Sequence, residues 1–221
     1  MVILIKFENT QAMGFQGALR GMRNPLNSWS KADSEYDSSG NLLMLGPNDT
    51  KTAHTLITAG PEHRKFLRQI FVNVDITAPL YWWKEQDQYR IGTTTDSCST
   101  MHKIAAKDFT LDDFSQEHLF DESRADLQGT IKKLNYWRNI YNNGNETFAP
   151  KDKAVWWQLI QLLPSSYNQM RTWTGSYENI FNMYHQRRNH KLDEWREGFT
   201  AWVESLPWAK EFLMVEKEKE N

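Results

Sequence analysis

The chain has 221 residues, of which 39% are hydrophobic and 13% aromatic, which is enough for a sizeable core and favours one compact domain. Its formal net charge of −2 provides no electrostatic basis for binding nucleic acid or an anionic membrane. The single cysteine, Cys98, excludes an internal disulfide framework and indicates a reducing, cytoplasmic compartment.

The N-terminal part of the chain predicts alternating strands, helices and loops. The run MVILIKFEN has five successive apolar residues, too few for a signal peptide or a membrane span, and predicts a strand. TQAMGFQGALRGM (10–22) predicts a helix, and the Asn-, Ser- and Gly-rich segment 24–50 predicts a long loop with a short hairpin around Ser38–Leu45. We then expect a short helix in DTKTAHTLI, capped by Asp49 or Thr50.

The next three elements alternate between helix and strand. GPEHRKFLRQI predicts a helix with Pro61 in its first turn. FVNVDIT (71–77) alternates apolar and polar residues and predicts a strand. APLYWWKEQDQYR returns to helical spacing and leads into DQYRIGTTTDSCSTMHK (87–103), a loop rich in hydroxyl side chains.

The remainder is expected to be almost wholly helical. Apolar residues at spacings of three and four predict a helix that ends at NNGN, and three more helices follow in PKDKAVWWQLIQLLP, SYENIFNMYHQRR and LDEWREGFTAWVESL. The charged tail 214–221 is expected to be solvated. With no internal repeat or composition break, the sequence predicts an α/β (α+β) fold over 1–221, a single domain in which a small sheet packs with several helices.

Short catalytic motifs are absent from the sequence. It contains no glycine-rich phosphate loop, no H-E-x-x-H and no cysteine pair, and its six histidines are scattered, so we expect no metal site. Three Trp-rich spots could stack on bases, namely Trp82–Trp83, Trp156–Trp157, and Trp195 with Trp202, although aromatic residues at helical spacing usually belong to the core. Cys98 could be a nucleophile, but a lone cysteine without a basic neighbour more often only packs.

The polar loop and the segment before it resemble a motif of a known protein family. DITAPLYWWKEQDQYRIGTTTDSCSTMH resembles the signature region of the flavin-dependent thymidylate synthases, in which a strand enters an A-P-x-F helix and R-H-R-x-x-S-x-x-x-x-S-x-R follows. Ala78–Pro79 keep their places, Arg90 stands at the third motif position and Thr93 replaces the first serine. The second serine is Ser99 if one residue is inserted, and Cys98 if none is.

Three other segments agree with the same family in order and spacing. GPEHRKFLRQIFVNVDI resembles G-H-x-S-P-F-E-H and places His63 on the first histidine, a flavin contact. LLPSSYNQMRTWTGSYENIFNMYHQRR resembles the family's L-P…N-F-L-x-L-R stretch, with Asn182 and Arg187 in step. NHKLDEWR resembles H-A-Q-x-E-I-R, with His190, Glu194 and Arg196 in register. The resemblance spans about 15–205.

The resemblance implies a reductive methylation of dUMP to dTMP. FAD would be the cofactor, NADPH the reductant and methylenetetrahydrofolate the one-carbon donor, in a homotetramer with sites at subunit interfaces. The residues that it assigns fall into three groups. They are Arg90, Arg187 and Ser99 as catalytic residues; His63, Asn182, His190, Glu194 and Arg196 as cofactor-binding residues; and Glu85, Arg90, Ser97, Cys98, Ser99 and Arg187 as substrate-binding residues.

The sequence also departs from the family pattern. The departures are Gln88-Tyr89 for the leading Arg-His, Thr100 or Met101 for the final Arg, Leu192 for the Gln of H-A-Q, and Ile160 for an upstream Arg. Lys84, Arg171 or Arg188 are candidate replacements for the missing charge. These losses favour a second hypothesis, a nucleotide- or flavin-binding homologue without methylation activity that acts as a binding or regulatory protein. A nucleic-acid role for the same pocket is a third hypothesis.

Overall fold

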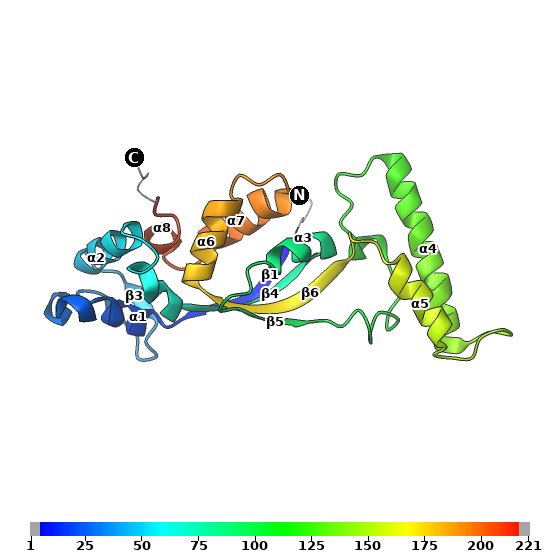
Figure 1. Cartoon of the computed structure of the whole chain (residues 1–221), viewed down its shortest axis with the longest axis horizontal. Coiled ribbons are helices and arrows are strands. Elements are labelled where there is room, and N and C mark those ends of the chain that lie inside the picture. Colours follow the sequence, from blue (N-terminus) through cyan, green and yellow to red (C-terminus); the bar gives the residue numbers. More distant parts are fainter. Residues whose placement is uncertain (1–4, 217–221) are drawn as a thin grey trace. The chain divides into compact units, whose positions relative to one another are not determined.

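The main sheet has four strands in the order β1-β4-β6-β5, formed by Lys6–Met13, Phe71–Pro79, Asn168–Ser176 and Thr94–Ser97 (Figure 1). In β4 every second residue from Val72 to Ala78 is buried, as the alternating sequence predicts. Asn73 accepts a hydrogen bond from Thr174, and Asp75 accepts one from Thr172. Because the residue number rises along β4 while that of its partner in β6 falls, the two strands run antiparallel. Together with the helices, the sheet confirms the predicted α/β (α+β) class.

The computed structural model describes residues 5–216, and these form two compact units built from separated segments. Unit 1 comprises the described residues up to Lys6, Ile76–Gln88 and Asp96–Arg171. Unit 2 comprises Phe7–Asp75, Tyr89–Thr95 and the described residues from Thr172 onward. The assignment of 1–221 to one domain stays a prediction, and residues 217–221 of the expected solvated tail lie outside the described range.

Unit 2 holds most of the helices. They are α1 (Phe15–Met22), α2 (Pro47–Thr58), α6 (Tyr177–Arg187), α7 (Thr200–Ser205) and α8 (Ala209–Phe212), together with the 3-10 helices η1 (Asn24–Leu26), η2 (Trp29–Lys31) and η3 (Arg64–Gln69) and the π-helix η5 (Glu194–Phe199). Figure 1 shows α6 and α7 side by side. The expected hairpin is present as β2 (Glu35–Tyr36) and β3 (Leu42–Met44), which pair antiparallel.

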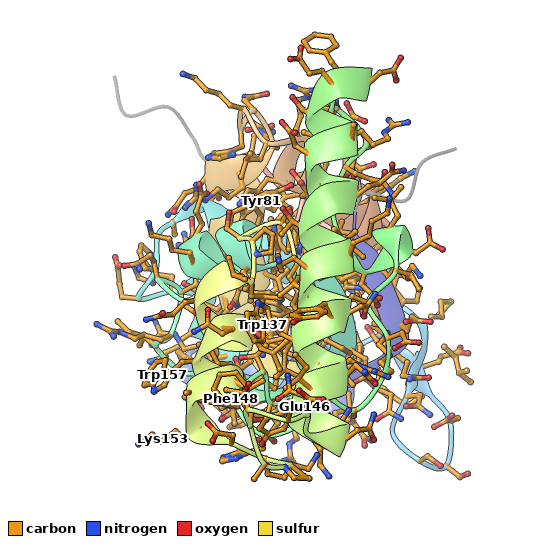
Figure 2. The ribbon with its side chains drawn as sticks, turned by 90° about the vertical axis from the view of Figure 1, so that its right-hand side faces the viewer. Tyr81, Trp137, Glu146, Phe148, Lys153 and Trp157 are labelled. Carbon is orange, nitrogen blue, oxygen red and sulfur yellow. The ribbon has the colours of Figure 1, made fainter. Side chains whose placement is uncertain are left out.

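Unit 1 contains α3 (Leu80–Gln86), η4 (Leu111–Asp113), α4 (Asp121–Asn143) and α5 (Lys153–Leu162). Its core gathers buried apolar residues from the loop segments on both sides of η4 and from α4 and α5: Ile104, Ala105, Phe109, Phe114, Leu127, Ile131, Leu134 and Leu159. In Figure 2, α4 and α5 run side by side, and Trp137 of α4 lies near Phe148, with ring centroids 6.5 Å apart. Trp157 lies on the outer side of α5 and is exposed (Figure 2).

The long segment 24–50 is fastened by a buried ion pair. Asp49 accepts from Arg23 Nε at 2.6 Å through one oxygen, and its other oxygen accepts from the backbone N–H and the hydroxyl of Ser34. Both charged side chains are 2% exposed. A buried charge is tolerated only when it is paired and hydrogen-bonded, so this network holds the loop against α1 and α2. The expected cap role of Asp49 is wrong, because α2 begins at Pro47 after Gly46.

Four other local predictions differ from the structure. Residues 10–13 belong to β1 rather than to the helix, which begins at Phe15. The segment after Pro61 forms a 3-10 helix from Arg64, not an α-helix from residue 61. Strand β6 interrupts a region that was expected to be helical. The last predicted helix begins as the π-helix η5. No helix of residues 5–216 combines the length and apolar character that a membrane crossing requires.

Candidate functional site

A cavity of 520 Å³ lies within unit 2, a volume within the usual range of about 300–1,000 Å³ for small-molecule sites. Its walls come from the end of η3, the start of β4, the turn after Tyr89 and the first two turns of α6. The lining residues are Arg68, Phe71, Ile91, Gly92, Ser176, Glu178, Asn179 and Asn182.

A buried arginine holds two residues of the cavity wall, Glu178 and Asn182. Arg64 Nε lies 3.2 and 3.1 Å from the two carboxylate oxygens of Glu178, and its guanidinium lies 4.7 Å from the ring centre of Phe181. Arg64 Nη2 also donates to Asn182 Oδ1 at 3.2 Å. Because the amide oxygen of Asn182 must face that donor, its NH₂ group is the part that can donate to a ligand. Asn182 is one of the predicted cofactor-binding residues.

The turn that carries Arg90 is held against α6 at two points. Asn179 Nδ2 donates to the Ile91 carbonyl at 2.8 Å, while its Oδ1 accepts from the backbone N–H and hydroxyl of Ser176 in a capping box. At the other end of the turn, the Tyr89 hydroxyl donates to Gln186 at 2.8 Å. Gly92 has φ +72°, a backbone conformation that favours glycine. The turn therefore presents Arg90, which is exposed, from a fixed backbone.

Arg187 lies beside the same turn. Its Nε donates to the Tyr89 hydroxyl at 2.8 Å, and its guanidinium lies 5.4 Å from the Tyr89 ring centre and 5.1 Å from that of Trp195. Trp195 is fully buried in η5, and π-helical turns occur often at functional sites. The residue before Arg90 thus contacts Arg187 through its side chain, a tyrosine that stands where the family motif has a histidine.

The remaining predicted cofactor residues of unit 2 differ in their surroundings. His63 is half exposed and lies 3.5 Å from the carboxylate of Glu62. His190 Nδ1 accepts from the Leu192 N–H at 3.1 Å, and Glu194 is buried in η5. Arg196 is exposed and pairs with Asp193 and with Glu197. Its positive charge is thus balanced by two carboxylates on the same surface.

Four predicted substrate-binding residues belong to unit 1. Glu85 is half-buried in α3, and Ser97 ends β5. The backbone of Cys98 is held by Gln169 and Met170, and Ser99 Oγ accepts from the His102 N–H at 3.0 Å. Cys98 is exposed, so the interpretation of this cysteine as a packing residue is wrong. Within residues 5–216, no three His, Cys, Asp or Glu side chains are grouped to hold a metal ion.

A second cavity, of 640 Å³, lies elsewhere in unit 2 and has a mostly apolar wall. Met22, Leu56 and Phe66 contribute to that wall, and the half-exposed His63 also lines it. Arg68 lines both this cavity and the one beside Asn182. The apolar cavity could therefore accommodate a planar apolar ring, and the cavity beside Asn182 could accommodate a polar group rich in hydrogen-bond acceptors.

Among known proteins, solved structures share this fold, whereas sequence comparison finds no relative. No family model matches the sequence, and no curated protein does. The crystal structure of thymidylate synthase X (ThyX) from Helicobacter pylori with FAD and dUMP superimposes with a TM-score of 0.66 at 15% identity, over 96% of this chain and 97% of that one. A second structure, of the flavin-dependent thymidylate synthase ThyX from the same organism complexed with FAD and dUMP, gives a TM-score of 0.63 at 16% identity, over 95% and 96% of the two chains. The resemblance read from the motifs is thus confirmed at the level of the fold.

Sequence reasoning missed several residues that shape the cavity. Asn179 could have been found, because Ser176 and a polar side chain three residues later form a capping-box pattern. Arg64 and Glu178 are 114 residues apart, and Tyr89 and Arg187 are 98 apart, so no local pattern predicts either contact. Arg68 was hidden in a segment whose local structure was predicted as an α-helix.

Proposed function

We propose that this protein is a flavin-dependent thymidylate synthase-like enzyme that binds FAD and a pyrimidine nucleotide, with dUMP as substrate. The observation that carries the proposal is the unit 2 cavity, where the Asn182 amide and the Arg68 guanidinium offer hydrogen-bond donors beside the turn that carries Arg90. Carbonyl and phosphate oxygens are the ligand atoms that such donors select. The fold likeness to two synthase structures supports the same assignment.

The donor set suits FAD. Asn182 would donate to a carbonyl or phosphate oxygen of the cofactor, Arg68 would face its negative charge, and His63 would contact it from the wall of the apolar cavity. When bound, FAD would supply the hydride chemistry that couples NADPH and methylenetetrahydrofolate to the nucleotide. The family resemblance also proposes His190, Glu194 and Arg196 as contacts to FAD.

The protein's own contribution to the reaction would be orientation and charge. A nucleotide monophosphate carries close to two negative charges at neutral pH, and burying it requires paired cations. We assign this role to Arg90 and Arg187, with Ser97, Cys98, Ser99 and Glu85 as proposed contacts to the nucleotide. A guanidinium near the pyrimidine would also stabilise negative charge that develops on the ring. Tyr89 would hold the Arg187 guanidinium in place for either task.

One observation favours the second candidate, a flavin- or nucleotide-binding homologue without methylation activity. Arg196, a proposed site residue, is engaged by Asp193 and Glu197, so its charge is already balanced within the chain. A site that had lost catalysis would still bind its ligands. The two candidates therefore agree on binding and differ only in turnover.

Purified protein separates the two candidates. Bound flavin, or FAD taken up by the apoprotein, together with conversion of dUMP to dTMP in the presence of methylenetetrahydrofolate and NADPH, is the result expected for the enzyme. Binding without dTMP formation supports the second candidate. A colourless protein that takes up no added FAD would reject both.

We also propose a homotetramer with shared sites. Five of the ten tryptophans, at positions 82, 83, 173, 195 and 202, are already buried within one chain, so tryptophan content alone supports assembly less than the sequence indicates. Sedimentation of the flavin-loaded protein at micromolar concentration tests this proposal. A stable monomer would reject it.

A further inference from the structure

Arg68 stands between the two cavities of unit 2 that the proposed function uses. It lines the apolar cavity of 640 Å³ and also the polar cavity of 520 Å³. Its side chain is exposed, and within residues 5–216 its guanidinium forms no ion pair or hydrogen bond. The neighbouring Arg64, by contrast, is buried and neutralised by Glu178. Arg68 is therefore the arginine on the cavity wall whose charge is available to a ligand.

A second cation lies on the same side of η3. In a 3-10 helix, residues three apart lie directly above one another, so Lys65 and Arg68 share one face. Lys65 is exposed and lines the apolar cavity with Arg68. The carboxylate of Glu62 also lines this cavity but lies next to His63. The face of η3 thus offers two positive charges, Arg68 on the wall of both cavities and Lys65 on the wall of the apolar one.

We infer that Arg68, assisted by Lys65, binds the diphosphate bridge of a dinucleotide whose two ends enter the two cavities. This inference rests on the proposed function and assigns to residues of η3 the contact with the phosphates of FAD. The diphosphate of FAD carries about two negative charges, which match the two cations of η3. One cavity has apolar walls that suit a flat ring, and the other has donors and the apolar side chains Phe71 and Ile91.

Flavin titration of the apoprotein tests the inference without an activity assay. Flavin fluorescence is followed while apoprotein is added to FAD or to riboflavin, which has the same ring system but no phosphate. Replacing Arg68 with Gln should weaken FAD binding roughly ten- to a hundred-fold, with riboflavin binding unchanged. Lys65→Gln should weaken FAD binding less. Arg20→Gln is the matched control, because Arg20 is an exposed cation of unit 2 that lines neither cavity.

Two further measurements separate a charge effect from a structural one. Arg68→Lys should recover part of the FAD affinity, and the salt dependence of FAD binding should become shallower in Arg68→Gln than in the wild type. Equal loss of FAD and riboflavin affinity in Arg68→Gln would overturn the inference, since it would mean a damaged cavity. Unchanged FAD affinity would also overturn it and leave the proposed function standing. Wild-type protein that binds neither flavin would reject the proposed function itself.

Discussion

Arg187 donates from Nε to the hydroxyl of Tyr89 at 2.8 Å, across 98 positions of the sequence. The same hydroxyl donates to Gln186, so its two hydrogen-bonding roles are both satisfied by the end of α6. A histidinium at position 89 would place a positive charge beside that of Arg187, whereas a tyrosine is neutral and accepts from the guanidinium. The tyrosine at the motif position therefore supplies a neutral hydrogen-bond acceptor to Arg187.

Tyr89→Phe should disturb the position of Arg187 while keeping the ring beneath it. The substitution removes one of the contacts that orient the guanidinium, so we expect dUMP affinity to fall by about 0.5–1.5 kcal/mol. Calorimetric titration of dUMP into flavin-loaded protein measures this change. Tyr136→Phe serves as the control, since Tyr136 is exposed on α4. Unchanged dUMP affinity in Tyr89→Phe would show that the contact only fastens the turn to α6.

Arg90 and Arg187 should bind one anion between them. Replacing either residue with Gln removes a cation at similar length, and each replacement should weaken dUMP binding by about 1.5–3 kcal/mol. If both side chains hold the same phosphate, the double replacement should cost less than the sum of the single ones. The affinities are measured by titration of dUMP, and full additivity would mean that the two residues act at separate places.

Breaking the buried ion pair between Arg64 and Glu178 should destabilise the protein. Glu178→Gln leaves the guanidinium of Arg64, whose side chain is 5% exposed, without its counter-charge. We expect a loss of about 3–5 kcal/mol in the free energy of unfolding, measured by chemical denaturation. The exposed pair Arg188–Glu216 is the control, and Glu216→Gln should cost less than about 1 kcal/mol. Equal effects of the two substitutions would contradict the role assigned to Arg64.

The stability of the protein should depend on Asp113 at acid pH. Burial raises the pKa of this carboxyl, but hydrogen bonds from Lys107 and Thr110 outweigh burial and leave the pKa below its usual value. A carboxyl whose pKa is lowered by folding contributes stability above its unfolded pKa and loses it as the pH falls through the folded value. In Asp113→Asn, melting temperature should therefore fall less steeply on acidification than in the wild type. Asp112→Asn, at an exposed neighbour, should leave the acid slope unchanged.

Much of the fold was predictable because its signal is local. Strand β4 alternates apolar and polar residues, and the long helix α4 buries Leu127, Ile131 and Leu134 at helical spacing. Strand β6 was missed because two of its buried positions are Gln169 and Gly175, so burial does not follow an apolar pattern.

The start of α1 and the shape of the site depend on contacts that are distant in sequence. Gly14 adopts φ +96°, and a Cβ there would lie 2.3 Å from the Gln69 carbonyl oxygen, so the chain turns at this residue before the helix can begin. Likewise, the cavity depends on the contact of Arg64 with Glu178. The motif resemblance assigns Asn182 to the cofactor site, but only the structure places it on the cavity wall and reveals which group its amide presents.

A crystal structure of the protein grown with FAD and dUMP tests the central claim most directly. We expect FAD in the cavity lined by Asn182, with a carbonyl or phosphate oxygen of the cofactor accepting from Asn182 Nδ2. We expect the dUMP phosphate within reach of Arg90 and Arg187. Ligand density elsewhere in the chain, with this cavity filled only by solvent at saturating FAD, would contradict it.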